Sequence, residues 1–342
     1  MREISIQKNE AGQRMDKFLA KYLNKAPKSF FYKMMRKKNI TLNGKKAVGN
    51  EQLKQGDVIK LFLAEETIEN FIDHSQFSKK KASSARKQTA GKKVQLDILY
   101  EDEAAVFINK PVGMLSQKAS PTDTSLVEYF IDYLLENGKI TEEELHTFHP
   151  SVCNRLDRNT SGIVAAGKTL QALQGLSEMF RDRTLKKYYL CLVKGQVKEN
   201  QRIHGYLVKN EKTNKVTVSQ KKPAEQTKDG KEASAIDTEY KVLARNRETT
   251  LLEVHLITGK THQIRAHLAS IGHPIAGDYK YGNRSFNDAL KKKYGLRSQL
   301  LHAYRLEFPE NCKGDIKQLS GKIIKAPVPA LFEQICKAQG VM

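Results

Sequence analysis

The chain has 342 residues, enough for two or more folded domains, and a formal charge of +21 from 59 Lys and Arg against 38 Asp and Glu. This excess favours a polyanionic partner, nucleic acid or an anionic membrane, but no apolar run is long enough to span a bilayer and no signal-peptide core begins the chain. The four cysteines form no C-x-x-C pair, so we expect neither a disulfide framework nor a zinc site, in a cytoplasmic protein that binds no membrane.

The N-terminal residues 1–65 are predicted to form a small basic α+β domain. Residues 14–60 carry thirteen Lys or Arg against three Asp or Glu, yet their apolar residues recur at regular spacing. The predicted elements are a helix over residues 15–23, a second helix from Ser29, a hairpin around Asn43-Gly44 and a strand over residues 58–63. A folded domain, rather than a basic tail, therefore supplies much of the net charge.

This order of two helices and a hairpin resembles the S4-type RNA-binding module, which is named after a ribosomal protein. The resemblance implies that basic side chains of the helices bind RNA, and the candidates are Arg14, Lys33, Arg36, Lys37 and Lys38. Contacts with phosphates would supply most of the affinity and make it sensitive to salt. A solvated basic face without a ligand is the alternative interpretation.

Residues 66–93 are predicted to be a basic linker. Their second half, residues 79–93, carries seven basic residues, no acidic ones and few large apolar ones, a composition that does not build a core. Periodicity returns at Leu96, and we expect residues 94–342 to form a second, larger domain.

The larger domain is predicted to be α+β, with a mostly antiparallel or mixed sheet, because strands outnumber helices and do not alternate with them regularly. The predicted strands cover residues 104–108, 162–166, 188–193, 235–242 and 251–257. Helices are expected after Thr169 and after Thr261, and Thr261 can cap the second of them. Residues 209–232 are polar and are expected to form an exposed excursion from the sheet.

The segment over residues 154–162 has the sequence NRLDRNTSG and places Asp157 between Arg155 and Arg158. A nearby guanidinium favours the ionised form of a carboxylate, which suits a nucleophile or an electrostatic stabiliser, whereas a surface ion pair is the simpler interpretation. The whole segment resembles the H-R-L-D-R-x-T-S-G signature of the RluA-type pseudouridine synthases, and the resemblance implies that Asp157 is the catalytic residue. Asn154 departs from this signature, where many relatives have His.

Two further segments match the same family. Residues 256–268 resemble its G-R-T-H-Q-I-R-x-H-L motif, which implies that Arg265 pairs with Asp157 and helps to hold a flipped nucleotide. The family's K-x-Y strand implies that Tyr189 is the active-site tyrosine, stacked on uracil and a candidate proton acceptor. A core aromatic is the alternative for this tyrosine, and Tyr188 is its rival in strand register.

Two loops extend the resemblance over nearly the whole chain. Residues 109–114 match the family's K-P-x-G loop, and residues 273–282 match its H-P-I-x-G-D-x-x-Y-G loop. The resemblance implies that Lys110, Arg155 and Arg158 contact the substrate.

Cofactor motifs are missing from the sequence. It contains no phosphate-binding glycine motif and no dinucleotide fingerprint, and His262 and His267 have no third ligand nearby. We therefore expect a reaction that needs neither a cofactor nor a metal.

The resemblance implies an isomerase, acting as a monomer, that converts uridine to pseudouridine in 23S (large-subunit) ribosomal RNA, as in the RluC and RluD branches of the family. Attack by Asp157 at ribose C1′ or at uracil C6 is compatible with the sequence. Transfer RNA is the alternative substrate. A non-catalytic ribosome-assembly factor and a glycosidase-like hydrolase are alternatives of other classes, although no second carboxylate is recognisably placed as an acid.

Overall fold

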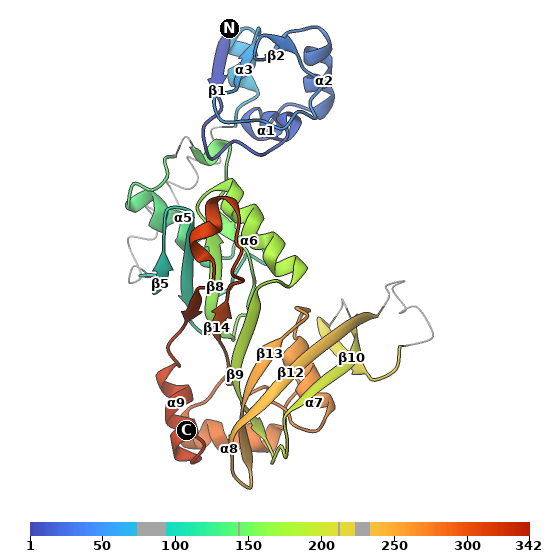
Figure 1. Cartoon of the computed structure of the whole chain (residues 1–342), viewed down its shortest axis with the longest axis vertical. Helices are drawn as coiled ribbons and strands as arrows, with labels where there is room; N and C mark the ends of the chain where they lie inside the picture. Colours follow the sequence, from blue (N-terminus) through green and yellow to red (C-terminus); the bar gives the residue numbers. More distant parts are fainter. Residues whose placement is uncertain (74–93, 143, 211–212, 223–232) are drawn as a thin grey trace.

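The computed structural model describes residues 1–73, 94–142, 144–210, 213–222 and 233–342. These residues form a sheet of four strands near the N-terminus and a separate sheet of eleven strands. The N-terminal unit lies at one end of the molecule, with the larger unit below it (Figure 1). No helix within these ranges is long and apolar enough to cross a membrane.

The N-terminal unit consists of β1 (Arg2–Ser5), α1 (Met15–Tyr22), α2 (Lys28–Arg36), β2 (Ile40–Leu42), β3 (Lys45–Lys46), β4 (Val58–Leu61) and α3 (Glu65–Asn70). Its strands pair in the order β1-β4-β2-β3, all antiparallel. The apolar stripe of α1 buries Met15, Phe18 and Leu19 in one core with α2 and the sheet. Asn43 and Gly44 both have positive φ, as a tight hairpin turn requires. The two predicted helices and the hairpin are thus confirmed.

The predicted linker begins too early. Residues 65–70 form α3, and Ile68 and Ile72 are buried in the N-terminal core. The acidic residues of this segment gave no sign that Ile68 on the helix and Ile72 just after it would complete the core. The folded N-terminal unit therefore extends to residue 73. Residues 74–93 of the predicted linker lie outside the described residues, and the division into domains stays a prediction.

The larger sheet has the strand order β11-β10-β12-β13-β9-β14-β8-β6-β5, with β7 and β15 pairing to β8 and β14. The strands are β5 (Ile98–Glu101), β6 (Ala105–Lys110), β7 (Ser151–Val152), β8 (Ser161–Gly167), β9 (Lys186–Lys194), β10 (Gln201–Asn210), β11 (Lys215–Ser219), β12 (Ser234–Arg245), β13 (Thr249–Leu256), β14 (Leu301–Glu307) and β15 (Ile323–Lys325). Only the β14–β8 pairing is parallel among those described. The sheet is therefore mixed, as predicted, and β6, β8, β9, β12 and β13 match the predicted strands.

The expected excursion over residues 209–232 is wrong in its first half. Strand β10 continues to Asn210, and β11 pairs antiparallel with it from Tyr206↔Ser219 to Asn210↔Lys215. Val216 is buried, so this polar hairpin still has an apolar side that packs on the sheet. Residues 211–212 and 223–232 lie outside the described residues.

Helices cover both faces of the larger sheet. They are α5 (Leu126–Glu136), α6 (Leu170–Asp182), α7 (Gln263–Ser270), α8 (Arg284–Tyr294) and α9 (Ala330–Ala338), with short 3₁₀ turns at Glu144–His146 and Gly314–Leu319. One core joins α5 and α7 to β6, β8, β9 and β13, while α6 packs in a second core and α8 and α9 in a third. The helix predicted after Thr169 is α6, and Thr169 caps it, because its hydroxyl accepts from the Ala172 N–H at 3.1 Å.

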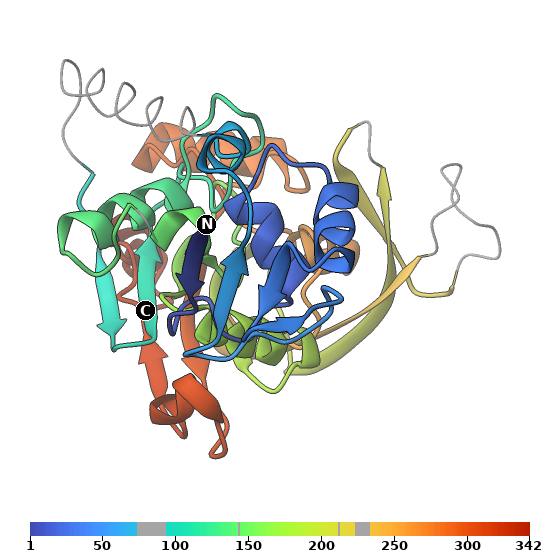
Figure 2. The same ribbon diagram turned by 90° about the horizontal axis from the view of Figure 1, so that it is seen from above.

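The loop after β1 forms hydrogen bonds between the two units. Asn9 Nδ2 donates to Glu144 Oε1 at 3.0 Å, and Thr147 Oγ1 donates to Glu10 Oε1 at 2.6 Å. Seen along the long axis, the N-terminal unit lies over the end of the larger sheet (Figure 2). The N-terminal unit thus contacts the larger unit directly, beside the 3₁₀ turn that follows α5.

Candidate active site

A cavity of about 900 Å³ opens between β9, the segment before β8, and the start of α7. Among the described residues that line the cavity, Asp157 is the only acidic one. The cationic side chains that line it are Lys118, Arg155, Arg158, Arg181, Lys187, Lys209, Lys260 and Arg265. A cavity with one carboxylate among many cations suits an anionic ligand that meets a single reactive acid.

Hydrogen bonds on both sides fix the backbone before Asp157. The Ser116 hydroxyl donates to the Leu156 carbonyl at 2.9 Å and accepts from the Leu156 N–H at 3.0 Å. The Asn154 amide reaches the backbone of β8, where it donates to Ile163 O at 3.2 Å and accepts from Ala165 N at 2.8 Å. Asn154, which departs from the family signature, therefore ties this segment to the sheet.

Gly162 is required by the packing of β8 against β14. Its φ is +112°, and a Cβ at this position would lie 2.2 Å from the carbonyl oxygen of Ala303. Only a residue without a side chain allows this approach, and φ in this range favours glycine independently. The turn before it is closed by the Thr160 N–H, which donates to Asp157 O at 3.0 Å. The signature segment thus positions Asp157 at the start of a buried strand.

Arg265 on α7 joins two carboxylates. Its NH1 donates to Asp157 Oδ2 at 2.8 Å, which is the contact that the resemblance implied. Its Nε and NH2 donate to Asp278 at 2.7 and 2.9 Å, and Asp278 is 1% exposed. These hydrogen bonds raise the pKa of Arg265 against the opposing effect of burial. The guanidinium is therefore a fixed cation beside Asp157.

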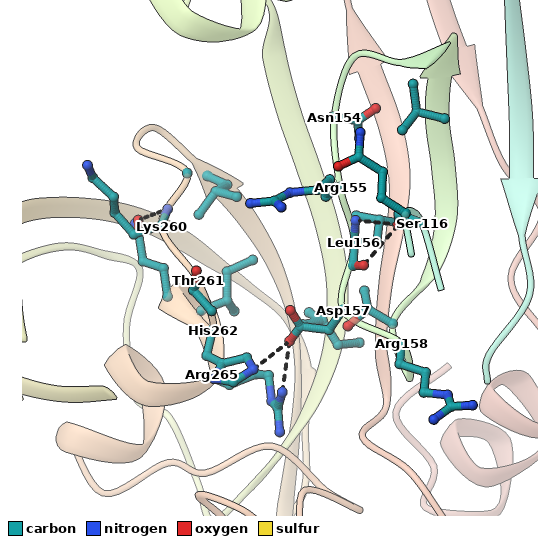
Figure 3. Close-up of a pocket in the computed structure, with 18 of the residues that line it drawn as sticks. Ser116, Asn154, Arg155, Leu156, Asp157, Arg158, Lys260, Thr261, His262 and Arg265 are labelled. Atoms are coloured by element: carbon teal, nitrogen blue, oxygen red, sulfur yellow. Dashed lines mark hydrogen bonds and ion pairs between the residues drawn. The ribbon is translucent and has the colours of Figure 1, made fainter. Parts of the chain in front are cut away.

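His262 approaches the same carboxylate from the turn before α7. Its Nε2 lies 3.9 Å from Asp157 Oδ2 (Figure 3). Its Nδ1 lies 2.9 Å from Tyr281 Oη. Tyr281 Oη also accepts from the Val216 N–H at 3.0 Å, so the phenol that contacts His262 Nδ1 is itself fixed by β11. Burial lowers the pKa of His262, which keeps the ring neutral at neutral pH.

The predicted cap of α7 is wrong. His262, with φ of +54°, precedes the first helical residue, and neither it nor Thr261 provides a side-chain cap. Instead, Gln263 Oε1 accepts from the Lys260 N–H at 3.1 Å and from the Thr258 hydroxyl at 2.8 Å. The His262 ring approaches Asp157 from this left-handed position before the helix.

The register of β9 places Tyr189 in the cavity. Tyr188, its rival, lies on the other face, stacked on His255 at 4.8 Å between ring centroids. Tyr189 is 8% exposed, and burial and the nearby Asp157 carboxylate raise the pKa of its phenol. The side chain therefore offers an aromatic surface and stays protonated, which disfavours the proton-acceptor role considered from the sequence.

Lys110 lies beneath the site rather than in it. The side chain is fully buried, and its Nζ donates to the carbonyls of Pro111, Met114 and Arg158 at 2.9, 2.9 and 3.2 Å. Burial lowers the pKa of Lys110 to about 8. The prediction that Lys110 contacts the substrate is not supported, because all three ammonium donors bind the loops that hold the Asp157 segment.

The other predicted RNA contacts fall in two places. Arg155 and Arg158 are exposed at the cavity, where Arg155 extends towards the Lys260 side and Arg158 points away from Asp157 (Figure 3). The N-terminal candidates Arg14, Lys33, Arg36, Lys37 and Lys38 are all exposed, and none lines the cavity. Arg14 is paired with Asp16 at 2.9 Å. The structure thus brings Asp157, Tyr189, Arg265, Arg155 and Arg158 to one cavity and leaves the N-terminal cations on another surface.

Three positioning residues were missed from the sequence: Ser116, Asp278 and Tyr281. Asp278 and Tyr281 belong to the H-P-I-x-G-D-x-x-Y-G loop, so their match to the family was the signal, although it assigned them no role. Ser116 carries no signal that distinguishes it from an ordinary loop serine. Its contact with Leu156 spans 40 positions and follows only from the fold.

The described residues contain no cluster of three His, Cys, Asp or Glu side chains that could hold a metal. His267 hydrogen-bonds Thr238 at 3.0 Å, away from His262, so the two histidines have separate structural partners. Burial raises the pKa of the Cys153 thiol to about 12, which keeps it protonated and unreactive.

Comparison with known proteins agrees with this geometry. The model of the family described as RNA pseudouridylate synthase matches residues 104–270. The ribosomal large subunit pseudouridine synthase C of Vibrio parahaemolyticus is 32% identical over 336 residues, which cover 97% of this chain and 94% of that protein. The protein of the same name from Salmonella typhi is 32% identical, covering 94% of this chain and 93% of its own.

A solved structure supports the fold. The human RNA pseudouridylate synthase domain containing 4 superposes with a TM-score of 0.57 at 23% identity, over 78% of this chain and 98% of that one. The α+β fold and the resemblance to the RluA-type enzymes are confirmed, and the chain belongs to the RNA pseudouridylate synthase family of isomerases.

Proposed function

We propose that this chain converts specific uridines of large-subunit ribosomal RNA to pseudouridine. Two relatives that bear the name of a ribosomal large subunit enzyme align with almost the whole chain, including its N-terminal unit. This agreement in length favours ribosomal RNA over transfer RNA as the substrate. The surplus of cations around the cavity supports a polyanionic substrate in either case.

The observation that carries the proposal is the environment of Asp157. It is the acidic residue among the described lining, and Arg265 holds it with a hydrogen bond of 2.8 Å in a cavity of about 900 Å³. A nucleotide flipped out of a stem or loop would fit such a cavity, with its ribose towards Asp157. A hydrolase of the inverting or retaining type needs a second carboxylate, and the described lining offers none.

The reaction is an isomerisation, so atoms balance without a co-reactant. The bond between uracil N1 and ribose C1′ breaks, the base rotates, and a bond forms between C5 and C1′. The C5 proton leaves, and N1 gains a proton. In our proposal the ionised Asp157 meets the reacting nucleoside, Tyr189 packs on the uracil, and Arg265 keeps the carboxylate oriented.

The N-terminal unit is proposed to be an S4-type RNA-binding domain, in a cytoplasmic, monomeric enzyme. Its exposed cations on and after α2, Lys33, Arg36, Lys37 and Lys38, would bind phosphates of the RNA outside the cavity. Such contacts position an RNA and do not by themselves select a uridine.

The decisive experiment compares Asp157→Asn with the wild-type protein on transcribed 23S ribosomal RNA and on bulk transfer RNA. Pseudouridine formation should disappear in Asp157→Asn, while RNA affinity changes less than about threefold, because the two side chains have the same shape. Asp288→Asn on the exposed face of α8 serves as the control that should retain full activity. Activity in Asp157→Asn would overturn the role of this residue. A wild-type protein that forms no pseudouridine in either RNA would favour the assembly-factor alternative.

A further inference from the structure

Lys187 has an environment that the proposed reaction does not explain. It lies on β9 two residues before Tyr189, so both side chains project from the same face of the strand into the cavity. The residue is 7% exposed. Its ammonium forms no hydrogen bond or ion pair with any part of the chain that the structure describes. The Nζ atom is not among the fully shielded polar atoms of the described residues, so it opens into the cavity, where a nearly buried charge without a partner is unfavourable and accessible to a ligand.

The surroundings of Lys187 are cationic. Arg183 lies four positions before it, directly follows α6 and adds to the positive potential at the ammonium. Ser177, Phe180 and Arg181 from the last turns of α6 line the same cavity, and α6 leads into β9 within a few residues. The acidic residue of the described lining, Asp157, is already paired with Arg265. The missing partner of Lys187 is therefore expected to come from the ligand and to be an anion.

We infer that Lys187 forms a phosphate-binding subsite in the same cavity as Asp157, for the RNA strand that carries the target uridine. The inference rests on the proposed function for the identity of the anion. In this inference Lys187 is a substrate-binding residue. The buried Lys110 is not, because its ammonium binds three backbone carbonyls. The two buried lysines differ in this respect, because the ammonium of Lys110 already has its partners within the chain.

The unpaired charge of Lys187 should lower the stability of the protein when no RNA is bound. Lys187→Met keeps the length of the side chain and removes the unpaired ammonium, so the substituted protein should fold and melt at a higher temperature than the wild type. RNA binding should change in the opposite direction. A purely structural lysine would lose stability when substituted, and this difference separates the two roles.

The test measures the Kd for transcribed 23S ribosomal RNA over a series of KCl concentrations for Lys187→Met, Lys187→Arg and Lys186→Met. Lys186 is the exposed neighbour on the opposite face of β9 and provides the matched loss of charge. Lys187→Met should weaken binding roughly tenfold and reduce the slope of log Kd against log salt by about 0.7, the value for one single-stranded phosphate. Lys187→Arg should recover most of the affinity, and Lys186→Met should match the wild type.

The other outcomes are equally informative. An unchanged salt slope with a lower kcat in Lys187→Met would show that Lys187 contacts the uracil rather than a phosphate, and would overturn the proposal. Equal losses in Lys187→Met and Lys186→Met would also overturn it, because overall charge would then explain both. If the wild-type protein forms no pseudouridine but Lys187→Met still loses one phosphate contact, the subsite stands and the proposed isomerase activity does not.

Discussion

Asp278 binds the Nε and NH2 atoms of Arg265, at 2.7 and 2.9 Å, and leaves NH1 free to bind Asp157. The carboxylate of Asp278 also accepts the backbone N–H groups of Lys280 and Tyr281 at 2.9 and 3.2 Å. The loop after α7 therefore holds the guanidinium on two of its nitrogens. Asp278 sets the direction in which Arg265 meets the proposed catalytic acid, without itself lining the cavity.

Asp278→Asn should lower kcat roughly tenfold or more while RNA affinity stays close to the wild-type value. The amide presents one donor where Arg265 needs an acceptor, so the guanidinium shifts and Asp157 loses its alignment. Single-turnover kinetics and Kd measurements separate these quantities. Asp278→Ala should in addition lower the free energy of unfolding by roughly 3 kcal/mol or more, because a buried guanidinium loses its partner. Normal kcat in Asp278→Asn would contradict the positioning role.

Tyr281→Phe should reduce kcat several-fold and change the pH dependence of the rate. Without the phenol, His262 Nδ1 loses its hydrogen-bond partner, so nothing from Tyr281 fixes the ring or its tautomer beside Asp157. The Val216 N–H also loses its acceptor, which should cost about 1 kcal/mol of stability. Tyr279→Phe is the control in the same loop, because the Tyr279 hydroxyl bonds only the exposed Asp288 among the described residues. Identical pH–rate profiles for both variants and the wild type would rule out the His262–Tyr281 contact as a positioning device.

The predictions from sequence were correct where the spacing of nearby residues determines the structure. The stripe of α1, the Asn43-Gly44 turn and the helix after Thr169 depend on contacts within a few residues, and all three are present. The candidate active-site cavity depends on long-range contacts instead. Arg265 and Asp157 are separated by 108 positions, and only the resemblance to a family linked them.

Two expectations differ from the structure because the decisive partners lie elsewhere in the chain. Lys110 ends a strand and was assigned to the substrate through the resemblance of its loop to the family's K-P-x-G loop, yet three carbonyls from residues 111 to 158 bind its ammonium in the interior. Strand β11 was assigned to an exposed excursion because its sequence is polar, whereas its pairing with β10 supplies the hydrogen bonds that define it. Composition describes neither the partners of a buried charge nor the pairing of an edge strand.

Gly162→Ala should lower stability far more than Gly113→Ala. Both glycines have positive φ, +112° and +88°, so both substitutions strain the backbone by roughly 1 kcal/mol. Only Gly162 has a neighbour in the way, since its Cβ would lie 2.2 Å from Ala303 O, whereas Gly113 has nothing within 4 Å. Thermal melts of the two variants measure the clash separately from the strain. Equal changes in Tm would mean that β8 and β14 move apart at little cost.

The extra stability of Lys187→Met should depend on pH. Burial lowers the pKa of Lys187 to about 8 from its ordinary value of 10.5, so the unfolded chain binds this proton more tightly than the folded protein does. The protonated Lys187 therefore lowers the free energy of unfolding of the wild type by about 3 kcal/mol below pH 8. This loss of stability disappears as the pH rises through 10.5. Denaturant titrations at pH 7 and pH 10 should show the two proteins converging at the higher pH. A difference that is independent of pH would place the effect in packing rather than in the charge.

The cations that follow α2 should bind RNA independently of the cavity. Arg36, Lys37 and Lys38 are exposed, and simultaneous substitution by alanine should weaken RNA binding and lower the salt slope by up to about 2. The reference is Lys291→Ala/Lys292→Ala/Lys293→Ala on α8, which removes the same charge at the opposite end of the molecule (Figure 1). Because the Debye length is about 8 Å at physiological salt, charges on α8 that touch no RNA should contribute little to the slope.

Salt titrations of Kd on the same ribosomal RNA check this difference. The α2 triple variant should keep the wild-type kcat once RNA is saturating, because none of its residues lines the cavity. A loss of kcat at saturation would instead connect the N-terminal unit to the chemistry. Equal salt slopes in the two triple variants would show that net charge, and not a defined phosphate-binding surface on the N-terminal unit, attracts the RNA.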